Sequence, residues 1–235
     1  MKIFAVDTSA KAASVAVLEN GEIKGEFFIN TMLTHSETLT PMADALLSSI
    51  RMSLSEIDCF AVNSGPGSFT GLRIGIAAVK GMAYALSKPC VPVSTLEAMA
   101  YNILHENACI CAVMDARCNQ VYNAIFDASG DSPRRICEDR AITTDQLASE
   151  LLTLNKKIIL VGDGAKLCFS KFAGLPDLHN VQLANENVRY QRASSTAFAA
   201  EKLFAEGKSV TAQELMPEYL RLPQAQRELM AKNNK

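Results

Sequence analysis

The segment that most constrains the fold runs from Ser64 to Ala77 and reads SGPGSFTGLRIGIA. It follows Cys59–Asn63, an apolar run that predicts a buried strand. Its glycines and proline predict a turn, and Ser68 or Thr70 can cap a helix that starts behind the turn. Lys88-Pro89 then ends the helical stretch. A buried strand, a glycine-rich turn and a helix in this order are typical of an α/β protein.

Two interpretations of this turn remain open. The free N–H groups of a helix N-terminus favour anions, so the turn could bind a phosphate group. However, no Lys followed by Ser or Thr stands at the spacing of a phosphate loop, and GxGxxG is absent as well. The spacing therefore favours the second interpretation, a structural turn.

The two halves of the chain repeat one pattern. Ala5–Gly21 corresponds to Ala112–Gly130, since each contains a strand, an Asp, a short turn, a second strand and a Gly turn. A third strand follows in each half, predicted over Gly25–Ile29 and Ile136–Ala141, and then a helix and a further strand. We therefore expect a duplicated βββαβα domain with a boundary near Ile103–Ala108.

Composition excludes several classes of protein. The formal net charge of −2 gives no basic excess for binding nucleic acid directly, so such a role would need a local patch or a partner. The seven Cys contain no CxxC pair and the three His are isolated, so we expect no dedicated metal site. No apolar run approaches the ~18 residues of a membrane span, and the N-terminus lacks signal-peptide features. We expect a cytoplasmic protein.

Two acidic residues and two glycines are candidates for a nucleotide site. Asp7 and Asp115 end corresponding strands, where acidic residues of actin-like ATPases hold metal-bound water near phosphate. Neither is followed by a glycine that would admit phosphate, so the favoured alternative is that each Asp caps its own turn. Gly162 and Gly164 could approach a base or ribose, although an ordinary strand-to-helix turn is favoured. GxSxG and HExxH are absent, so no catalytic residue is predicted.

The helix after the glycine-rich turn is rich in small residues. Gly71, Gly75 and Gly81 lie inside it, although glycine in a helix costs about 1 kcal/mol relative to alanine. Such a helix must approach another backbone closely, either the protein's own sheet or a helix of another subunit. Arg73 and Lys80, about two turns apart, could flank such a contact.

Six segments, in this order, resemble the TsaB (YeaZ) family of bacterial tRNA threonylcarbamoyladenosine biosynthesis proteins. They are Ala5–Ser9, Thr34–Pro41, Asn63–Ala83, Val113–Ala124, Val161–Ala165 and Pro217–Arg221. GPGSFTGLRIG is the most specific of these motifs. The resemblance implies an actin-like (ASKHA, ribonuclease H-like) fold of two related domains. It also implies a role in forming threonylcarbamoyladenosine beside the anticodon of tRNA.

The resemblance further implies a non-catalytic subunit. In this pathway the transfer enzyme is a paralogue, TsaD, which binds a metal through an HxxxH motif. The matching segment here is Val93–Met99, in which Leu96-Glu97 is kept but neither flanking position is His. The chain is therefore expected to hold no cofactor or metal of its own, while ATP is bound and used by partner subunits. A nucleotide at the subunit interface is left open.

The partners implied by the resemblance are a TsaD-type paralogue and a TsaE-type ATPase, with tRNA bound only through the complex. Pairing with TsaD uses helices of the first domain, here Leu39–Ile50 and Gly71–Leu86. The same surface could form a homodimer when the protein is alone. The expected interface residues are His35, Leu39, Met42, Leu46, Gly71, Arg73, Gly75, Val79, Lys80 and Met82.

The expected domains are residues 1–105 and 106–222, and a last helix at 223–232 is expected to return to the first domain. Two other functions compete with the scaffold role. One is an independent enzyme of this fold, an ATPase, a kinase or a glycoprotease-like protein. The other is a regulatory or chaperone-like module that only controls the stability of the paralogue.

Overall fold

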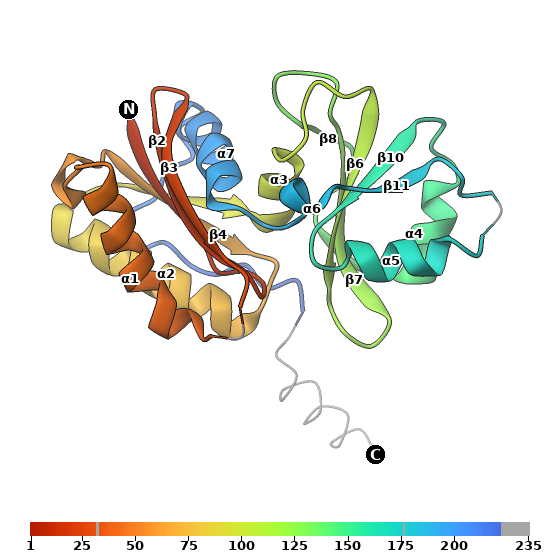
Figure 1. Cartoon of the computed structure of the whole chain (residues 1–235), viewed down its shortest axis with the longest axis horizontal. Helices are drawn as coiled ribbons and strands as arrows, with labels where there is room; N and C mark the ends of the chain where they lie inside the picture. The colour runs from red at the N-terminus through yellow and green to blue at the C-terminus, as the bar shows by residue number, and fades with distance from the viewer. Residues whose placement is uncertain (32, 176, 222–235) are drawn as a thin grey trace, which may run out of the picture.

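Two β-sheets, each covered by helices, stand side by side in the molecule (Figure 1). The computed structural model describes residues 1–31, 33–175 and 177–221. The first sheet contains β1 (Lys2–Asp7), β2 (Ala13–Glu19), β3 (Glu22–Ile29), β4 (Cys59–Gly65) and β5 (Cys90–Ser94). The second contains β6 (Ala108–Asp115), β7 (Gln120–Asp127), β8 (Arg134–Arg135), β9 (Arg140–Thr143), β10 (Lys157–Val161) and β11 (Val181–Leu183).

The strand orders confirm the predicted duplication. The first sheet is ordered β3-β2-β1-β4-β5 and the second β8-β7-β6-β10-β11, so corresponding strands take corresponding places. In both sheets the first strands are antiparallel, while the strands that follow a helix join in parallel. Asn20 and Gly21, both with positive φ, form the predicted tight turn between β2 and β3.

The prediction of one continuous third strand over Ile136–Ala141 is wrong. Two short strands, β8 and β9, pair with β7 on either side of an interruption. Within it, Asp139 accepts hydrogen bonds from Arg135 at 2.5 Å and Ser94 at 2.5 Å, and Arg135 also pairs with Glu97 at 3.0 Å. The backbone N–H groups of Ile136 and Cys137 both donate to the carbonyl of Ile125, so two residues oppose one and the regular ladder is interrupted there.

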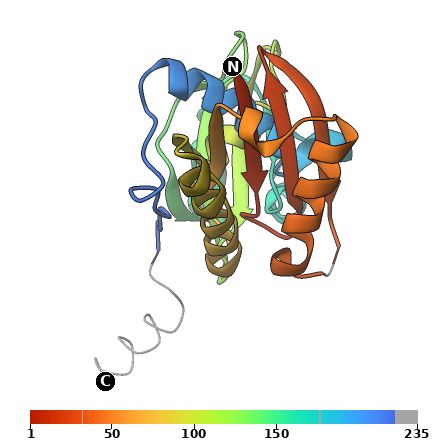
Figure 2. The same cartoon turned by 90° about the vertical axis from the view of Figure 1, so that its left-hand side faces the viewer.

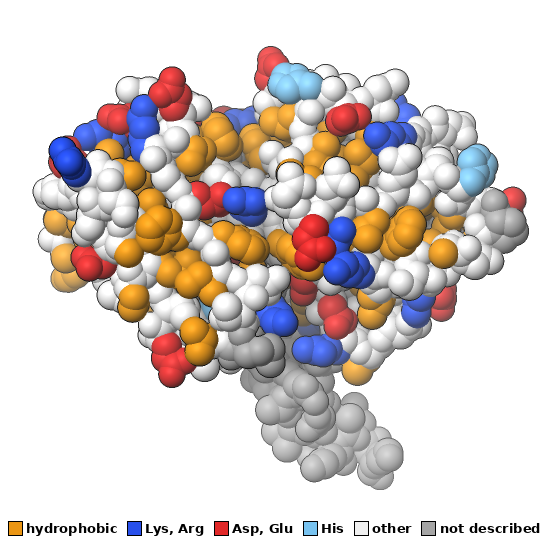
Figure 3. Space-filling model, viewed as in Figure 1, with side chains coloured by type: hydrophobic (Ala, Val, Ile, Leu, Met, Phe, Trp, Pro, Cys, Tyr) orange, Lys and Arg blue, Asp and Glu red, His pale blue; other side chains and the backbone are white. Residues whose placement is uncertain are grey.

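Helices α1 (His35–Ser49) and α2 (Phe69–Leu86) lie side by side on one face of the first sheet (Figure 2). Their inward side chains pack against buried strand residues such as Phe4 and Val15. Over these helices, hydrophobic side chains reach the surface with few charged ones between them (Figure 3). On the second sheet, α4 (Thr144–Leu151) and α5 (Ala165–Phe172) take the corresponding place. Among the described residues, no helix has both the length and the apolar character that crossing a bilayer would require.

Two helices lie between the sheets, and each packs on the sheet of the other half. Helix α3 (Thr95–Ala100) buries Leu96 and Met99 against the second sheet. Helix α7 (Ala193–Ala205) buries Ala197 and Ala200 against the first sheet. The short helices η1 (Leu54–Glu56) and α6 (Glu186–Arg189) complete the described elements.

The predicted second domain, 106–222, includes residues that pack on the first sheet. Helix α7 belongs with the first sheet, and the segment after it continues there, since Val210 pairs with Cys90 and Leu215 is buried in the first core. The helix predicted at 223–232 lies outside the described residues.

Candidate functional site

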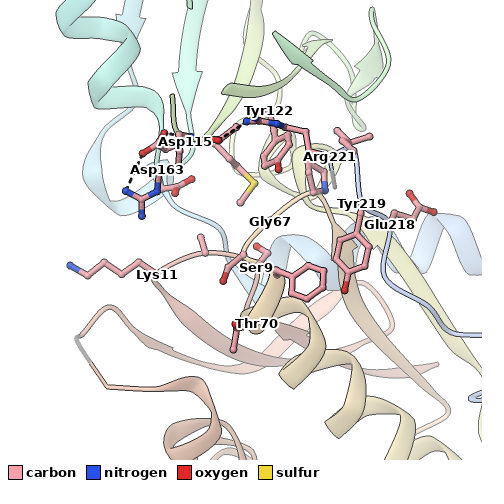
Figure 4. Close-up of a pocket in the computed structure, with 18 residues that line it drawn as sticks. Ser9, Lys11, Gly67, Thr70, Asp115, Tyr122, Asp163, Glu218, Tyr219 and Arg221 are labelled. Carbon is pink, nitrogen blue, oxygen red and sulfur yellow. Dashed lines mark hydrogen bonds and ion pairs between the residues drawn. The ribbon is translucent and has the colours of Figure 1, made fainter. Parts of the chain in front are cut away.

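A cleft of about 550 Å³ opens between the two domains, where β1, β4, β6 and β10 end (Figure 4). From the first domain it is lined by the β1–β2 loop and by the glycine-rich turn. From the second it is lined by the β6–β7 turn and by Asp163 after β10, while residues 218–221 border its mouth. The duplicated topology brings these four strand ends together, so the cleft is the natural site for a ligand in this architecture.

Asp7 does not face this cleft. Its Oδ1 accepts hydrogen bonds from the backbone N–H of Ser9 at 2.8 Å and the Ser9 hydroxyl at 2.7 Å. Its Oδ2 accepts a hydrogen bond from the Asn63 amide at 2.6 Å, and Asn63 in turn accepts one from Thr196 of α7. Burial raises the pKa of Asp7, although the hydrogen bonds from Ser9 oppose that shift. Both carboxylate oxygens are thus engaged by the chain itself.

Asp115 and Asp163 do line the cleft. The backbone N–H of Arg117 donates to Asp115 at 2.8 Å, which closes the turn after β6. Asp163 accepts a hydrogen bond from the Gln191 amide at 3.0 Å, and its surroundings exclude enough water to raise its pKa to about 6. Asp163 was not among the site residues predicted from the sequence. The signal for it was an acid between two glycines at the end of a buried strand.

The glycines near the cleft serve the protein's own backbone. Gly162 has a φ of +104°, and a Cβ there would collide with the carbonyl of Val113. A Cβ at Gly164 would lie 3.0 Å from the backbone nitrogen of Asp115. In the glycine-rich turn, the N–H of Ser68 donates to the carbonyl of Ser9 at 2.6 Å. In both segments, the turn after β10 and the glycine-rich turn, the glycines allow close contacts within the protein's own backbone, as expected of a structural turn.

Most of the expected interface residues lie inside the protein. Leu39, Met42, Leu46 and Val79 are buried in the first core. A Cβ at Gly71 or Gly75 would collide with the carbonyl or the hydroxyl of Thr8, so these glycines face the chain's own β1–β2 loop. These six residues occupy the inward sides of α1 and α2 and pack within the chain.

The remaining four expected residues have other neighbours within the chain. The Nε2 atom of His35 lies 2.8 Å from the carbonyl of Ala10. Arg73 donates to the Tyr219 hydroxyl at 3.0 Å, and Lys80 donates to the carbonyls of Gln213 and Leu215. Met82 is half-buried at the edge of the first core.

The helices α1 and α2 expose charged and large residues such as Asp44, Arg73 and Tyr84, but one group of their accessible residues is uncharged and mostly small. We call it the outer helix face, and it consists of Ala45, Ala77, Ala78, Gly81, Met82 and Ala85. At Gly81 an added Cβ would meet no atom within 4 Å. This face can therefore receive a closely approaching backbone.

The positions where the paralogue's HxxxH spacing would fall are filled by core residues. Thr95 and Met99 are both fully buried between the sheets. Within the described ranges, no three His, Cys, Asp or Glu side chains lie together as metal ligands would.

Comparisons with known proteins identify relatives along almost the whole chain. A family model described as TsaD, tRNA N6-adenosine threonylcarbamoyltransferase, matches residues 30–229. The chain is 31% identical over 227 residues to the tRNA threonylcarbamoyladenosine biosynthesis protein TsaB of Escherichia coli strain K12, covering 94% of this chain and 95% of that protein. The TsaB protein of Bacillus subtilis strain 168 is 27% identical, with 96% of each chain covered.

Solved structures agree with the sequence relatives. YeaZ from Pseudomonas aeruginosa has a TM-score of 0.78 and 27% identity, covering 93% of this chain and 99% of that one. The activator of 2-hydroxyisocaproyl-CoA dehydratase from Clostridium difficile, solved with bound ADPNP, has a TM-score of 0.52 and 13% identity, covering 97% and 98%. The latter shows the fold alone. The expected actin-like fold of two related domains is confirmed.

Proposed function

Since this chain belongs to the TsaD family, and within it to the TsaB (YeaZ) proteins of tRNA threonylcarbamoyladenosine biosynthesis, we propose that it is a non-catalytic scaffold subunit in that pathway. Its family membership gives it a role in the pathway. The proposal adds that it pairs with a TsaD-type transferase, that a TsaE-type ATPase joins the pair, and that tRNA is bound only through the complex.

The state of Asp7 is the observation that carries the non-catalytic role. An acid that assists phosphate or metal chemistry must present an oxygen to the cleft. Both carboxylate oxygens of Asp7 instead accept hydrogen bonds, one from Ser9 and the other from Asn63. The burial of this side chain also disfavours its charged form. Such a group holds a turn and a strand in place. In this proposal the chain therefore uses no cofactor, and ATP acts in the partner subunits.

The outer helix face supports docking through α1 and α2. Because this face is uncharged and mostly small, α1 and α2 could pack closely on two helices of a paralogue and form a four-helix bundle. The charged residues of α2 do not interfere, because Arg73 and Lys80 are directed to the chain's own C-terminal segment. Since the paralogue has the same family fold, the same face could pair two copies of this chain when the partner is absent.

Gly81→Arg tests this docking face. The side chain would project from the outer helix face into open space, so the variant should fold with unchanged helix content. Co-purification with the TsaD-type protein should be lost, because a long charged side chain would separate the helices. Gly174→Arg is the matched control, since Gly174 also has no atom within 4 Å of an added Cβ but lies in the second domain. Wild-type affinity of the Gly81→Arg protein would contradict the proposed face.

A reconstitution with one component left out at a time tests the scaffold role. This protein is mixed with the TsaD-type and TsaE-type proteins, tRNA and threonylcarbamoyl-adenylate, and modified tRNA is measured. We expect no modification without this chain and full modification with Asp115→Asn, which keeps the acceptor for Arg117 but removes the charge.

The same reconstitution separates the two competing functions. Loss of modification with Asp115→Asn, in a complex that still assembles, would favour an enzyme with its own active site. Modification that persists without this chain, when the TsaD-type protein is in excess, would favour a purely regulatory role.

A further inference from the structure

The segment 209–221, which we call the strap, is rooted in the first domain. Val210 and Cys90 exchange two backbone hydrogen bonds of 2.8 Å each. Leu215 is fully buried in the first core. The ammonium group of Lys80 donates to the carbonyls of Gln213 at 3.2 Å and Leu215 at 3.0 Å. This part of the strap is therefore held by α2 and by the edge strand β5.

The next residues of the strap run over the glycine-rich turn. The N–H of Glu218 donates to the carbonyl of Ser64 at 2.8 Å, and a Cβ at Gly65 would collide with the carbonyl of Glu218. The Tyr219 ring stacks on Phe69 with centroids 4.7 Å apart and an interplanar angle of 26°. Arg73 completes this stack, because its guanidinium lies 3.9 Å from the Phe69 centroid and donates to the Tyr219 hydroxyl. The turn that opens α2 is thus shaped to receive the strap.

The end of the described strap reaches the other domain. Arg221 donates from Nη1 to the carbonyl of Ala116 at 2.7 Å, and Ala116 lies in the turn between β6 and β7. Glu218, Tyr219 and Arg221 all border the cleft (Figure 4). One segment fixed to the first domain therefore bonds to the second domain across the mouth of the cleft.

We propose that the strap is a latch that holds the two domains in this arrangement, with Arg221 as the catch. The root of the latch, the part around Val210 and Leu215, is anchored by the buried Leu215 and held by several hydrogen bonds. The catch is a single hydrogen bond from the accessible guanidinium of Arg221. Loss of that bond costs little compared with unfolding, so the catch can open while the root stays in place. Opening would let the domains move apart around the α3–α7 contact and widen the cleft. This inference does not depend on the proposed function.

The absence of Trp from the chain allows a direct test with the full protein. Tyr219→Trp places one fluorophore in the stack on Phe69, where acrylamide quenching reports whether the strap is seated. Adding Arg221→Ala should increase quenching and enlarge the radius of gyration in small-angle X-ray scattering. We expect the ratio of latched to open molecules to fall by roughly tenfold, the effect of losing a hydrogen bond from a charged donor.

Two further variants make the outcome decisive. Arg117→Ala also removes a cleft-lining cation, but one whose ion pair is with Asp115 of its own turn, so it should change neither readout. Arg221→Lys keeps a cationic donor and should restore part of the latched state. Increased quenching without a change in the radius of gyration would overturn the latch, and so would no change in either readout. An Arg117→Ala protein that opens like Arg221→Ala would overturn it as well.

Discussion

Three acids lie at or just after strand ends near the cleft, and their neighbours give them different properties. Asp7 is enclosed by Ser9 and Asn63, and Asp115 closes its own turn. Asp163 is the one with a single amide partner, Gln191, and a pKa raised to about 6 by burial. Strand-end position predicts that an acid lies at this edge of the sheet. It cannot predict which acid faces the cleft, because that depends on neighbours such as Asn63 and Gln191, which are distant in the sequence.

The raised pKa of Asp163 predicts a pH dependence of stability. Because the folded pKa exceeds the ordinary value of 3.8, the folded state binds the proton more tightly than the unfolded state. This stabilisation is complete below pH 3.8 and is lost as the pH rises to about 6. Asp163→Asn removes the charge, so it should stabilise the protein at pH 8 and change little at pH 4. The shift corresponds to about 3 kcal/mol, which we reduce to about 1–2 kcal/mol because Asp163 is partly open to the cleft.

Urea unfolding of wild type and variant at a series of pH values from 4 to 8 measures this difference. Asp44→Asn, at an exposed position of α1, is the control and should give parallel curves. A constant difference between wild type and Asp163→Asn across the series would refute the assigned role of burial.

At the scale of elements, α2 presents two faces that its composition does not distinguish. The small residues show that something approaches this helix closely, and both the core and another subunit were plausible partners. Gly75 and Gly81 lie on different faces of the helix. A Cβ added at Gly75 would collide with Thr8 of the β1–β2 loop, whereas a Cβ added at Gly81 would contact no other atom. Helical spacing alone could not assign them, because Gly and Ala occur on both sides of the helix.

Alanine substitutions at these two glycines should therefore change stability in opposite directions. At Gly81 the added methyl meets nothing, so the gain in helix propensity should stabilise the protein by about 0.5–1 kcal/mol. At Gly75 the methyl must displace the buried Thr8 side chain, which donates to the carbonyl of Gly71 at 2.8 Å. Overpacking of this kind costs about 1–3 kcal/mol, which exceeds the gain in propensity. Denaturant midpoints of the two variants check the signs, and equal shifts would contradict the division of the helix into two faces.

Elements with local start and stop signals were predictable, and those without were not. The capping box of Thr143 and Gln146 forms as predicted, with hydrogen bonds of 3.0 and 3.1 Å in the two directions. Helix α5 begins after Gly164, as the favoured strand-to-helix turn predicts, but Gly164 has no side chain to cap the helix, so no capping pattern marks its start. The split of the third strand into β8 and β9 lies where Asp139 and Arg135 bond to Ser94 and Glu97 of the other half, and no local pattern reveals these partners.

At the scale of the whole molecule, the two halves exchange helices. The repeat of strands and helices predicts the duplication, because each half carries its own hydrophobic pattern. The exchange of α3 and α7 was missed, since an Ala-rich helix gives no indication of which sheet it will cover. Its buried residues show the consequence: Ala197 and Ala200 fill the first core, while Leu96 and Met99 fill the second. Each sheet therefore has one face that its own half cannot cover.

This exchange predicts that neither half folds alone. The fragment 1–105 would expose the sheet face that α7 covers, including Ile3, Ala5 and Val91, and the fragment 106–235 would expose Ile110 and Phe126. Uncovered apolar sheet faces favour aggregation over folding. The division lies between the exposed residues His105 and Glu106, so it breaks no core contact directly. Mixed from denaturant, the two fragments should restore both interfaces and form a one-to-one complex.

Circular dichroism and urea unfolding of each fragment and of the mixture test this expectation. The mixture should show a cooperative transition that neither fragment shows by itself. A cooperative transition of 1–105 alone would mean that α7 is dispensable for the first sheet. The same result for 106–235 would mean that α3 is dispensable for the second. Either would return the domain boundary to the single division suggested by the repeat.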